Sequence, residues 1–261
     1  MDLTQLAKAV CTIAKDAGAV ILDIYNTADF GVEQKSDNSP LTRADRDANQ
    51  VICDGLEALS VKYPIISEEN KAIPYAERKD FEYAWLVDPL DGTKEFIKRN
   101  GEFTVNIALI HNNSIVLGVV YTPVSDDLYW AVKGEGAYLE KDGKSTKLSA
   151  NHFSLKDHGL GVVCSRSHLN EATQAFVDGL NEPTRVPKGS SLKFLILAQG
   201  GAHVYPRLAP TMEWDTGAAQ IVLEEAGGKV IAQDTKAPLQ YNKENLLNPY
   251  FIAYGAVSEV V

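Results

Sequence analysis

The apolar residues of the first 60 positions follow the period of an α-helix. Their steps of three and four predict one helix on residues 3–24. A second amphipathic helix is predicted to open at Thr42 and to end at Pro64, after a polar loop of sequence VEQKSDNSP. The inward positions are Leu3, Leu6, Val10, Ile13, Ala17, Ile21 and Ile24 in the first helix and Val51, Ile52, Leu56 and Leu59 in the second.

The pattern then changes to that of β-strands. Two short apolar segments, PIIS and YAWLV, each run into acidic residues. From Phe103 the runs FTVNIALI and IVLGVVY flank the turn HNNS, which predicts a β-hairpin. LYWAVKG, GAYLE and the turn KDGK continue the antiparallel region. We therefore expect an α+β N-terminal half that ends near Ala150.

Strands and helices alternate in the rest of the chain. The expected order is strand GLGVVC, helix EATQAFVDGL, helix SLKFLILAQ, strand AHVYP, helix DTGAAQIVLEEA, strand KVIA and a last strand in NPYFIAYG. This alternation indicates an α/β half. We predict an α+β protein with two domains, an N-terminal domain on residues 1–150 and a C-terminal domain on residues 151–261.

Charge limits the partners of the protein. The chain has 261 residues and a formal net charge of −10, which argues against nucleic acid or a bare anionic membrane as the main partner. A small anionic substrate remains open, because divalent cations can invert the local field. No nucleic acid and no other macromolecular partner is expected. A monomer is expected, with a dimer as the alternative.

The cysteines and the N-terminus indicate the compartment. Cys11, Cys53 and Cys164 form no CxxC pair, so neither a zinc site nor a disulfide framework is expected. The N-terminus lacks the pattern of a signal peptide, and no segment reaches the roughly 18 apolar residues of a membrane span. We expect a cytoplasmic protein; peripheral attachment to the cytoplasmic side of the inner membrane is the alternative.

Acidic residues follow both short strands and begin a later helix. They are Glu68 and Glu69, Asp88 and Asp91, and Asp215. Such positions have an ordinary explanation, because Asp caps helices and is stabilised by the positive helix end. For Asp215 that explanation is as good as a functional one, and for Glu69 it is better.

The turn DPLDGT favours a metal site. Its proline lacks an N–H and is expected to end the strand, which brings Asp88 and Asp91 to one side with the Leu90 carbonyl between them. Carboxylate and carbonyl oxygens are the ligands that suit Mg²⁺. Gly92 lets the backbone approach a ligand closely. A helix that starts near Thr93 would direct free N–H groups at an anion.

Closely grouped carboxylates repel one another, and without a cation some of them would be protonated. The acids that imply bound cations, if they meet in space, are Glu68, Asp88, Asp91 and Asp215.

Asp45 has two interpretations. TRAD is similar to a capping box with Asp45 in place of the usual Glu. Alternatively, Asp45 accepts a proton from Thr93, whose hydroxyl then orients a water.

Four ordered motifs resemble those of the lithium-sensitive, magnesium-dependent sugar phosphatases typified by inositol monophosphatase. They are TRAD, SEEN, DPLDGT and WDTGAAQIVLEEAGG, and the resemblance spans roughly residues 4–232. It implies a layered α/β/α/β/α fold, in which the N-terminal domain binds metal and the C-terminal domain binds substrate. The segments KEF after DGT, GSSLKF and YPRLAPTMEWD are similar to the bacterial CysQ-type 3′(2′),5′-bisphosphate nucleotidases. Gly217 departs from the pattern, since many relatives have another small residue there.

The resemblance implies hydrolysis of the 3′-phosphate of adenosine 3′,5′-bisphosphate to AMP and phosphate, a step linked to sulfate assimilation. The 5′-phosphosulfate relative of this nucleotide is the second implied substrate. Two Mg²⁺ ions are implied, with a third, weaker ion near Glu68 as the alternative. Their ligands would be Glu68, Asp88 and the Leu90 carbonyl for the first ion, and Asp88, Asp91 and Asp215 for the second. Thr93 and Asp45 would activate the attacking water, and Glu68 is counted with them as catalytic.

The resemblance also assigns substrate contacts. They are Glu68, Leu90, Asp91, Gly92, Thr93, Ser165, His168, Gly189, Ser190, Lys193, Arg207 and Asp215. His168 would stack on adenine, or it is an ordinary surface histidine. Ser190 and Lys193 would hold the sugar or the 5′-phosphate, or they are a helix cap and a solvated lysine. Arg207 would pair with the 5′-phosphate, or it is a surface arginine.

Other functions compete with this one. An inositol monophosphatase or another sugar phosphatase would use the same chemistry on a different substrate, and the discriminating residues are His168, Lys193 and Arg207. A non-catalytic nucleotide- or ion-sensing protein would not need Thr93 and the complete acid set. A purely structural domain would use its acids only as helix caps.

Overall fold

The computed structural model describes residues 2–27, 30–34, 40–164 and 169–259. Its helices are α1 (Leu3–Tyr25), α2 (Arg43–Ala58), α3 (Tyr75–Arg78), α4 (Thr93–Ile97), α5 (Glu171–Asp178), α6 (Leu192–Ala198) and α7 (Glu213–Glu225). Its first nine strands are β1 (Glu33–Gln34), β2 (Pro40–Leu41), β3 (Ile65–Ser67), β4 (Tyr83–Asp91), β5 (Thr104–His111), β6 (Ser114–Thr122), β7 (Asp127–Val132), β8 (Gly136–Lys141) and β9 (Lys144–Lys147). The others are β10 (His152–Phe153), β11 (Gly161–Cys164), β12 (Thr184–Pro187), β13 (Val204–Arg207), β14 (Lys229–Ala232), β15 (Phe251–Tyr254) and β16 (Ala256–Val257).

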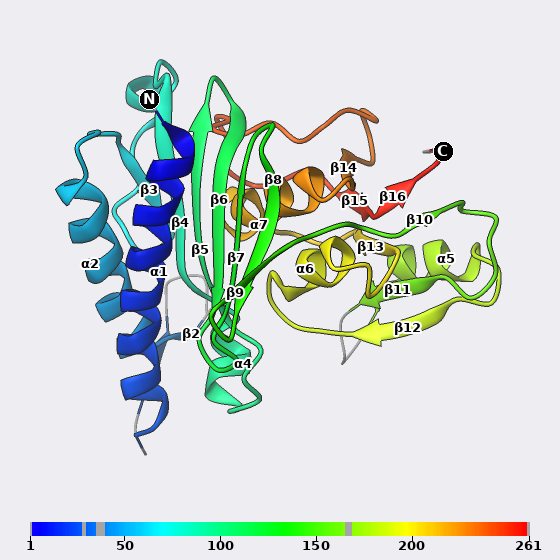
Figure 1. Ribbon diagram of the computed structural model, residues 1–261, viewed down its shortest axis with the longest axis horizontal. Helices are drawn as coiled ribbons and strands as arrows, with labels where there is room; N and C mark the ends of the chain where they lie inside the picture. The colour runs from blue at the N-terminus through cyan, green and yellow to red at the C-terminus, as the bar shows by residue number, and fades with distance from the viewer. Residues whose placement is uncertain (1, 28–29, 35–39, 165–168, 260–261) are drawn as a thin grey trace.

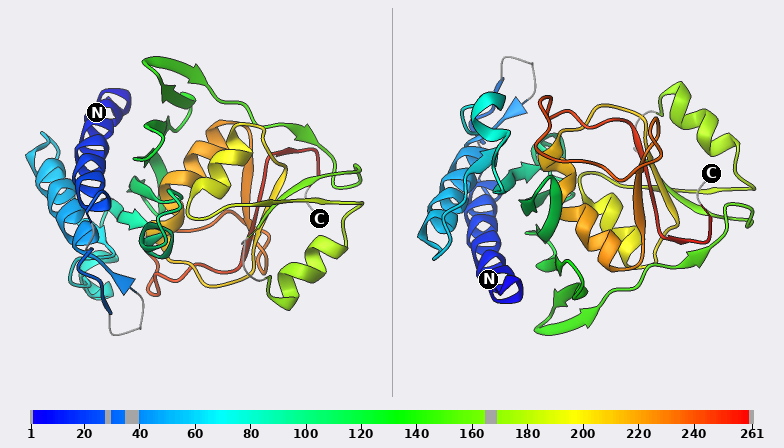
Figure 2. Two further views of the ribbon diagram at one scale, coloured as in Figure 1. Left: turned by 90° about the horizontal axis from the view of Figure 1, so that it is seen from below. Right: turned by 90° about the horizontal axis from the view of Figure 1, so that it is seen from above.

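The elements form five layers, α/β/α/β/α, which confirms the predicted fold class (Figures 1 and 2). α1 and α2 cover one face of the larger sheet. α6 and α7 lie between the two large sheets, and α5 packs on the outer face of the smaller one. Among the described helices, none has the length and apolar composition needed to cross a membrane.

The larger sheet has seven strands in sequence order, β3 to β9. β3 and β4 are parallel, and each later strand runs antiparallel to its neighbour. The smaller sheet has the order β12-β11-β13-β15-β14, with β11, β12 and β13 parallel and β15 antiparallel to both of its neighbours. The pairs β1-β2 and β10-β16 complete the topology.

Strands β4 to β7 of the larger sheet are buried on both faces, and successive residues of each strand mostly contact different cores. In β4, Trp85 and Val87 face α1 and α2, whereas Ala84 and Leu86 belong to the core around α7. That second core also takes in residues of the smaller sheet, such as Phe251. The strands of the larger sheet precede residue 150 in the sequence, and those of the smaller sheet follow it. Both sheets contribute to this second core, so a division into two domains at residue 150 stays a prediction.

The close packing of α7 depends on glycine. A Cβ atom on Gly118 of β6 would lie 2.5 Å from the carbonyl oxygen of Ala218 in α7. A Cβ atom on Gly217 would lie 3.1 Å from Ile115 and 3.3 Å from Ala108. Because Gly217 lies against the sheet, its lack of a side chain brings the first turns of α7 close to the larger sheet.

Two expected element ends are wrong. Pro89 does not end β4, which continues to Asp91; a bulge between Asp88 and Asp91 places the proline where the ladder needs no N–H donor. The second helix ends at Ala58, and not at Pro64, because Leu59 takes an extended backbone conformation. Proline restricts mainly the residue before it, so it did not determine this helix end.

Candidate active site

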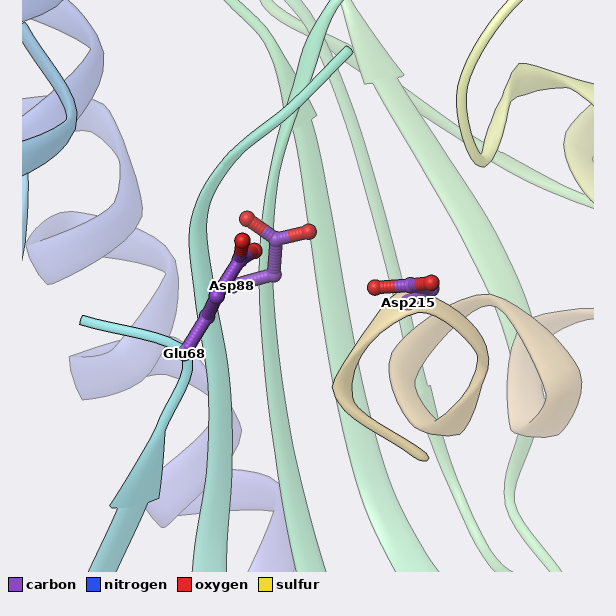
Figure 3. A group of neighbouring side chains, drawn as sticks. All are labelled: Glu68, Asp88 and Asp215. Atoms are coloured by element: carbon purple, nitrogen blue, oxygen red, sulfur yellow. The ribbon is translucent and has the colours of Figure 1, made fainter. Parts of the chain in front are cut away.

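Three acidic side chains meet at one edge of the larger sheet (Figure 3). Glu68 directly follows β3, Asp88 lies in β4, and Asp215 lies in the first turn of α7. Each offers a carboxylate oxygen, and these oxygens lie within 4.8 Å of one another. β3 and β4 are parallel neighbours, so their carboxyl ends meet at the same edge. α7 brings in the third acid from more than a hundred residues further along the chain.

Burial and mutual repulsion make this cluster unfavourable when every member is charged. Burial is the main cause that raises the pKa of Asp88 well above its usual range, and Glu68, Asp91, Asp215 and Asp45 add repulsion. Burial, and then the charge of Asp91, raises the pKa of Asp215 to about 8. A bound divalent cation would remove both penalties. The oxygen-only donor set fits Mg²⁺.

The bulge of β4 shapes the turn beside the cluster. The Leu90 N–H donates to Asp88 Oδ1 at 3.0 Å, which fixes that carboxylate against its own turn. Gly92 has a φ of 99°, in the left-handed region, and a Cβ atom there would lie 2.9 Å from the Glu102 carbonyl oxygen. Glycine therefore permits both the conformation and the close approach. α4 begins directly after it, at Thr93, as the sequence predicts.

Asp45 has both of the contacts that its two interpretations require. Its Oδ2 accepts hydrogen bonds from the Thr42 N–H at 2.7 Å and the Thr42 hydroxyl at 2.5 Å, which caps α2. Its Oδ1 lies 3.1 Å from the Thr93 hydroxyl oxygen, which is also 3.3 Å from the Leu90 carbonyl oxygen. The cap holds the Asp45 carboxylate in the position from which it reaches Thr93.

Asp91 is not among the three acids that lie within 4.8 Å of one another. Its Oδ2 instead accepts hydrogen bonds from Ser190 and Ser191. It is nevertheless close enough to repel the charges of Asp88 and Asp215. The sequence grouped Asp91 with the acids but contained no sign of its serine partners.

Two neighbouring cavities share a wall at this site. The metal-side cavity has a volume of about 430 Å³ and is lined by the acid cluster and Thr93. The second cavity, of about 460 Å³, is lined by Gly189, Ser190, Ser191, five cationic side chains and four acidic ones, Asp91, Glu95, Glu102 and Asp215. We call it the basic cavity because its cationic side chains outnumber its acidic ones. Asp91, Gly92 and Asp215 line both cavities. The cationic side chains are Lys94, Lys98, Lys188, Lys193 and Arg207.

The predicted substrate residues Lys193 and Arg207 are both held in place. The buried Lys193 donates to the Ser190 carbonyl oxygen at 3.0 Å, and its ammonium group lies 5.5 Å from the centre of the Tyr205 ring. Arg207 donates through Nη2 to the Pro210 carbonyl oxygen at 2.6 Å. Its Nε is buried and has no hydrogen-bond partner in the described part of the structure, so it retains donor capacity.

Three lysines of the basic cavity were missed from the sequence. Lys94 and Lys98 are four positions apart on and just after α4, which places them on one side of that helix. Lys188 follows β12, an exposed edge strand with no apolar alternation. Its Nζ lies 3.3 Å from Glu102 Oε1, and Glu102 Oε2 accepts a hydrogen bond from the Gly189 N–H. Of these three lysines, only Lys94 and Lys98 could have been predicted to lie together, from their helical spacing in the sequence.

Comparison with known proteins is decisive for the family. The sequence profile of the inositol monophosphatase family matches residues 2–254. The chain belongs to this family. It is 44% identical to the 3′(2′),5′-bisphosphate nucleotidase CysQ of Escherichia coli (strain K12) over 244 residues, 93% of this chain and 96% of the relative. It is 34% identical to the CysQ of Haemophilus influenzae over 253 residues, 96% of this chain and 93% of the relative.

Solved structures support the same family. The crystal structure of CysQ from Bacteroides thetaiotaomicron superposes with a TM-score of 0.85 at 42% identity and covers 97% of each chain. An IMPase/NADP phosphatase complexed with Mg²⁺ and phosphate has a TM-score of 0.80 at 21% identity, with coverage of 98% of this chain and 93% of that one. The latter likeness shows the inositol monophosphatase fold alone.

Two predicted substrate residues of this inositol monophosphatase family member, Ser165 and His168, lie outside the described residues. Glu69 is half-buried beside Glu68, and its N–H donates to the Ser67 hydroxyl at 3.3 Å. It is not a member of the acid cluster.

Proposed function

We propose that this protein is a Mg²⁺-dependent 3′(2′),5′-bisphosphate nucleotidase. It removes the 3′-phosphate of adenosine 3′,5′-bisphosphate to give AMP and phosphate, and it accepts the 5′-phosphosulfate relative as a second substrate. The observation that carries this proposal is the shared wall between an acid cluster and a cavity lined by five cationic side chains. The similarity to CysQ proteins supports the choice of substrate.

The metal ligands follow the expected set. Glu68, Asp88 and the Leu90 carbonyl would hold one Mg²⁺, and Asp88, Asp91 and Asp215 a second. Bound Mg²⁺ supplies a more acidic water and stabilises the charge of the phosphoryl group and of the leaving oxygen. The chain itself must supply the geometry, because phosphoryl transfer depends mostly on positioning and electrostatics.

Thr93 and Asp45 would orient the attacking water. When the Thr93 hydroxyl donates its one hydrogen to Asp45, its lone pairs are free to accept a hydrogen bond from that water. Asp45 is kept in place by the cap of α2, so the pair is preorganised.

The basic cavity would bind the second phosphate. With the 3′-phosphate over the acids, the 5′-phosphate lies in the neighbouring cavity, where Lys193 and Arg207 can contact it. Arg207 lines this cavity, and a guanidinium group pairs well with a phosphate. An inositol monophosphate has no second phosphate for this cavity, which favours a substrate with two phosphates, such as the nucleotide, over inositol monophosphate.

Phosphate release from four substrates tests the proposal. They are adenosine 3′,5′-bisphosphate, 3′-phosphoadenosine 5′-phosphosulfate, inositol 1-phosphate and fructose 1,6-bisphosphate, each with and without Mg²⁺ and then with Li⁺. We expect dependence on Mg²⁺, inhibition by Li⁺ and a higher kcat/KM for the two nucleotides. A preference for the sugars would overturn the substrate assignment.

Variants separate the chemistry from the substrate choice. Thr93→Val should lower kcat about 100-fold or more for every substrate, whereas Thr93→Ser retains the hydroxyl and should remain active. Arg207→Gln should lower kcat/KM for the nucleotides more than for inositol 1-phosphate. Equal losses for both classes would show that Arg207 does not contact the 5′-phosphate.

A further inference from the structure

Residues 189–191 and the start of α6 reach across to the DPLDGT turn. The Ser190 and Ser191 hydroxyl oxygens lie 2.6 Å and 2.7 Å from Asp91 Oδ2. The Ser191 N–H donates to the same oxygen at 2.6 Å. Hydrogen bonds to an ionised carboxylate are short and strong, so these contacts fix the orientation of the Asp91 side chain. The partners are about 100 positions apart in the chain.

The hydrogen bonds from the two serines reach only one of the two carboxylate oxygens of Asp91. Among the described residues, the hydrogen bonds to this carboxylate all reach Oδ2. A carboxylate has about four lone-pair sites on two oxygens, so an oxygen with three donors has no capacity left for a cation. Oδ1 is therefore the oxygen through which Asp91 can bind a metal.

Ser191 is oriented for this contact by a third residue. It is 2% exposed, and its hydroxyl oxygen accepts a hydrogen bond from Asn106 Nδ2 at 2.8 Å. The single hydroxyl hydrogen is left for an acceptor, and the two within reach are Asp91 Oδ2 and the Asp215 carbonyl oxygen at 2.9 Å. The charged carboxylate is the stronger acceptor. One serine thus contacts two of the residues proposed as metal ligands.

Helix capping does not account for the Ser191 hydroxyl. Ser191 is the N-cap residue of α6, but its side chain makes no capping hydrogen bond to that helix. The hydroxyl is directed away from the helix, to the acid of the other half of the chain.

Ser190, which precedes Ser191 in the chain, has an unusual backbone conformation. Its φ is 50°, in the left-handed region that non-glycine residues rarely adopt. Its hydroxyl lies 2.8 Å from the Thr104 hydroxyl and 3.0 Å from the Asp91 carbonyl oxygen. Surrounding contacts must hold such a residue in place, and strained residues of this kind cluster at functional sites.

We propose that Ser191, assisted by Ser190, is a positioning residue for the metal ligand Asp91. The serines occupy Oδ2 and present Oδ1 to the second Mg²⁺. The inference rests on the proposed function. Ser191 also begins the helix that carries Lys193 into the basic cavity, so one segment positions both a metal ligand and a substrate contact.

Titration of the metal-free protein with MgCl₂ tests this role directly. In Ser191→Ala, we expect the Kd for Mg²⁺, measured by calorimetry without substrate, to rise about 10- to 100-fold, as is typical when a group that orients a metal ligand is removed. The Mg²⁺ concentration for half-maximal activity should rise in parallel. Saturating Mg²⁺ should restore most of kcat, and the KM for adenosine 3′,5′-bisphosphate should change less than twofold.

Two controls separate positioning from general stability. Thr122→Val removes another buried hydroxyl, bonded to Ser125 and Asp127 in the larger sheet, and should lower Tm without changing the Kd for Mg²⁺. Ser191→Thr retains the hydroxyl and should restore Mg²⁺ affinity. If Ser191→Ala does not fold, Ser190→Ala should show the same shift to a smaller extent.

The proposal is overturned if Ser191→Ala binds Mg²⁺ as the wild type does, or if only its KM for the nucleotide rises. Failure of the proposed function has a different signature. A wild-type protein that binds Mg²⁺ but releases no phosphate from any substrate would refute the activity, while the MgCl₂ titration of Ser191→Ala would still decide the role of the serine.

Discussion

At the scale of single residues, the two oxygens of Asp45 have separate partners, whereas the serines contact only one carboxylate oxygen of Asp91. Asp45 caps α2 through Oδ2 and reaches Thr93 through Oδ1. Asp91 is held by serines through Oδ2 alone. For Asp45, the contacts that its structural and its functional interpretation require are therefore both present, which is why the sequence could not choose between the two.

The buried acids predict how stability depends on pH. The pKa of Asp215 is raised from its ordinary 3.8 to about 8, so between these values the folded protein binds more protons than the unfolded chain. The stability of the metal-free protein must fall as the pH rises through this window, and the raised pKa of Asp88 acts in the same direction. Melting of the metal-free protein from about pH 5 to about pH 8 should show Tm decreasing.

Asp215→Asn is the matched variant. It removes the charge but keeps the size of the side chain, so the fall in Tm should be shallower and Mg²⁺ should raise Tm less at about pH 8. An identical pH slope in both proteins would contradict the raised pKa of Asp215.

At the scale of elements, the bulge of β4 joins a strand directly to the active-site turn. The strand continues past Pro89, and Gly92 then turns the chain into α4. Sequence pattern predicted the strand, the turn residues and the short helix, because each depends on nearby residues. It did not predict the bulge, because the register shift depends on pairing with β5.

Gly92→Ala should destabilise the protein through this turn. The left-handed φ and the 2.9 Å approach to the Glu102 carbonyl oxygen both oppose a Cβ atom, so we expect a loss of about 1–3 kcal/mol in the free energy of unfolding by urea. Gly143→Ala is the control, since its φ is 70° but nothing lies within 4 Å of its Cβ position. Equal losses in both variants would mean that the close approach has no cost.

The same distinction between local and distant causes explains which site residues could be predicted. Glu68, Asp88 and Asp215 come from motifs whose spacing is visible in the chain, and they do meet. Lys188 follows a polar edge strand with no apolar pattern, so no feature of the sequence indicated that it lines the cavity. The Ser191 contact with Asp91 arises only when the two sheets pack together.

At the scale of the whole molecule, the predicted halves are tied together by buried polar groups as well as by the shared core. Arg78, 3% exposed, donates to Asn242 Oδ1 at 2.8 Å and to the Glu244 carbonyl oxygen at 2.8 Å. The segment that Arg78 contacts is fixed within its own half, because the fully buried Glu213 accepts hydrogen bonds from the N–H groups of Asn242 and Lys243. Breaking such a network would leave buried groups unpaired.

We therefore expect the chain to unfold as one cooperative unit. Two variants, each retaining one tryptophan, would report on the two halves: Trp85 in β4 and Trp214 in α7. Urea transitions followed by their fluorescence should coincide, and far-ultraviolet circular dichroism should give the same midpoint. Separate midpoints would show that residues 1–150 and 151–261 are independent domains.

The acid cluster also affects how long the molecule persists. Burial of its carboxylates, and then their mutual repulsion, costs stability at neutral pH unless a cation is present. Asp215 lies on the helix between the two sheets, so this cost falls on the whole fold. Proteases degrade the transiently open form, and a ligand that binds only the native state lowers the population of that form. Scarcity of divalent cations would therefore shorten the lifetime of this protein as well as slow its reaction.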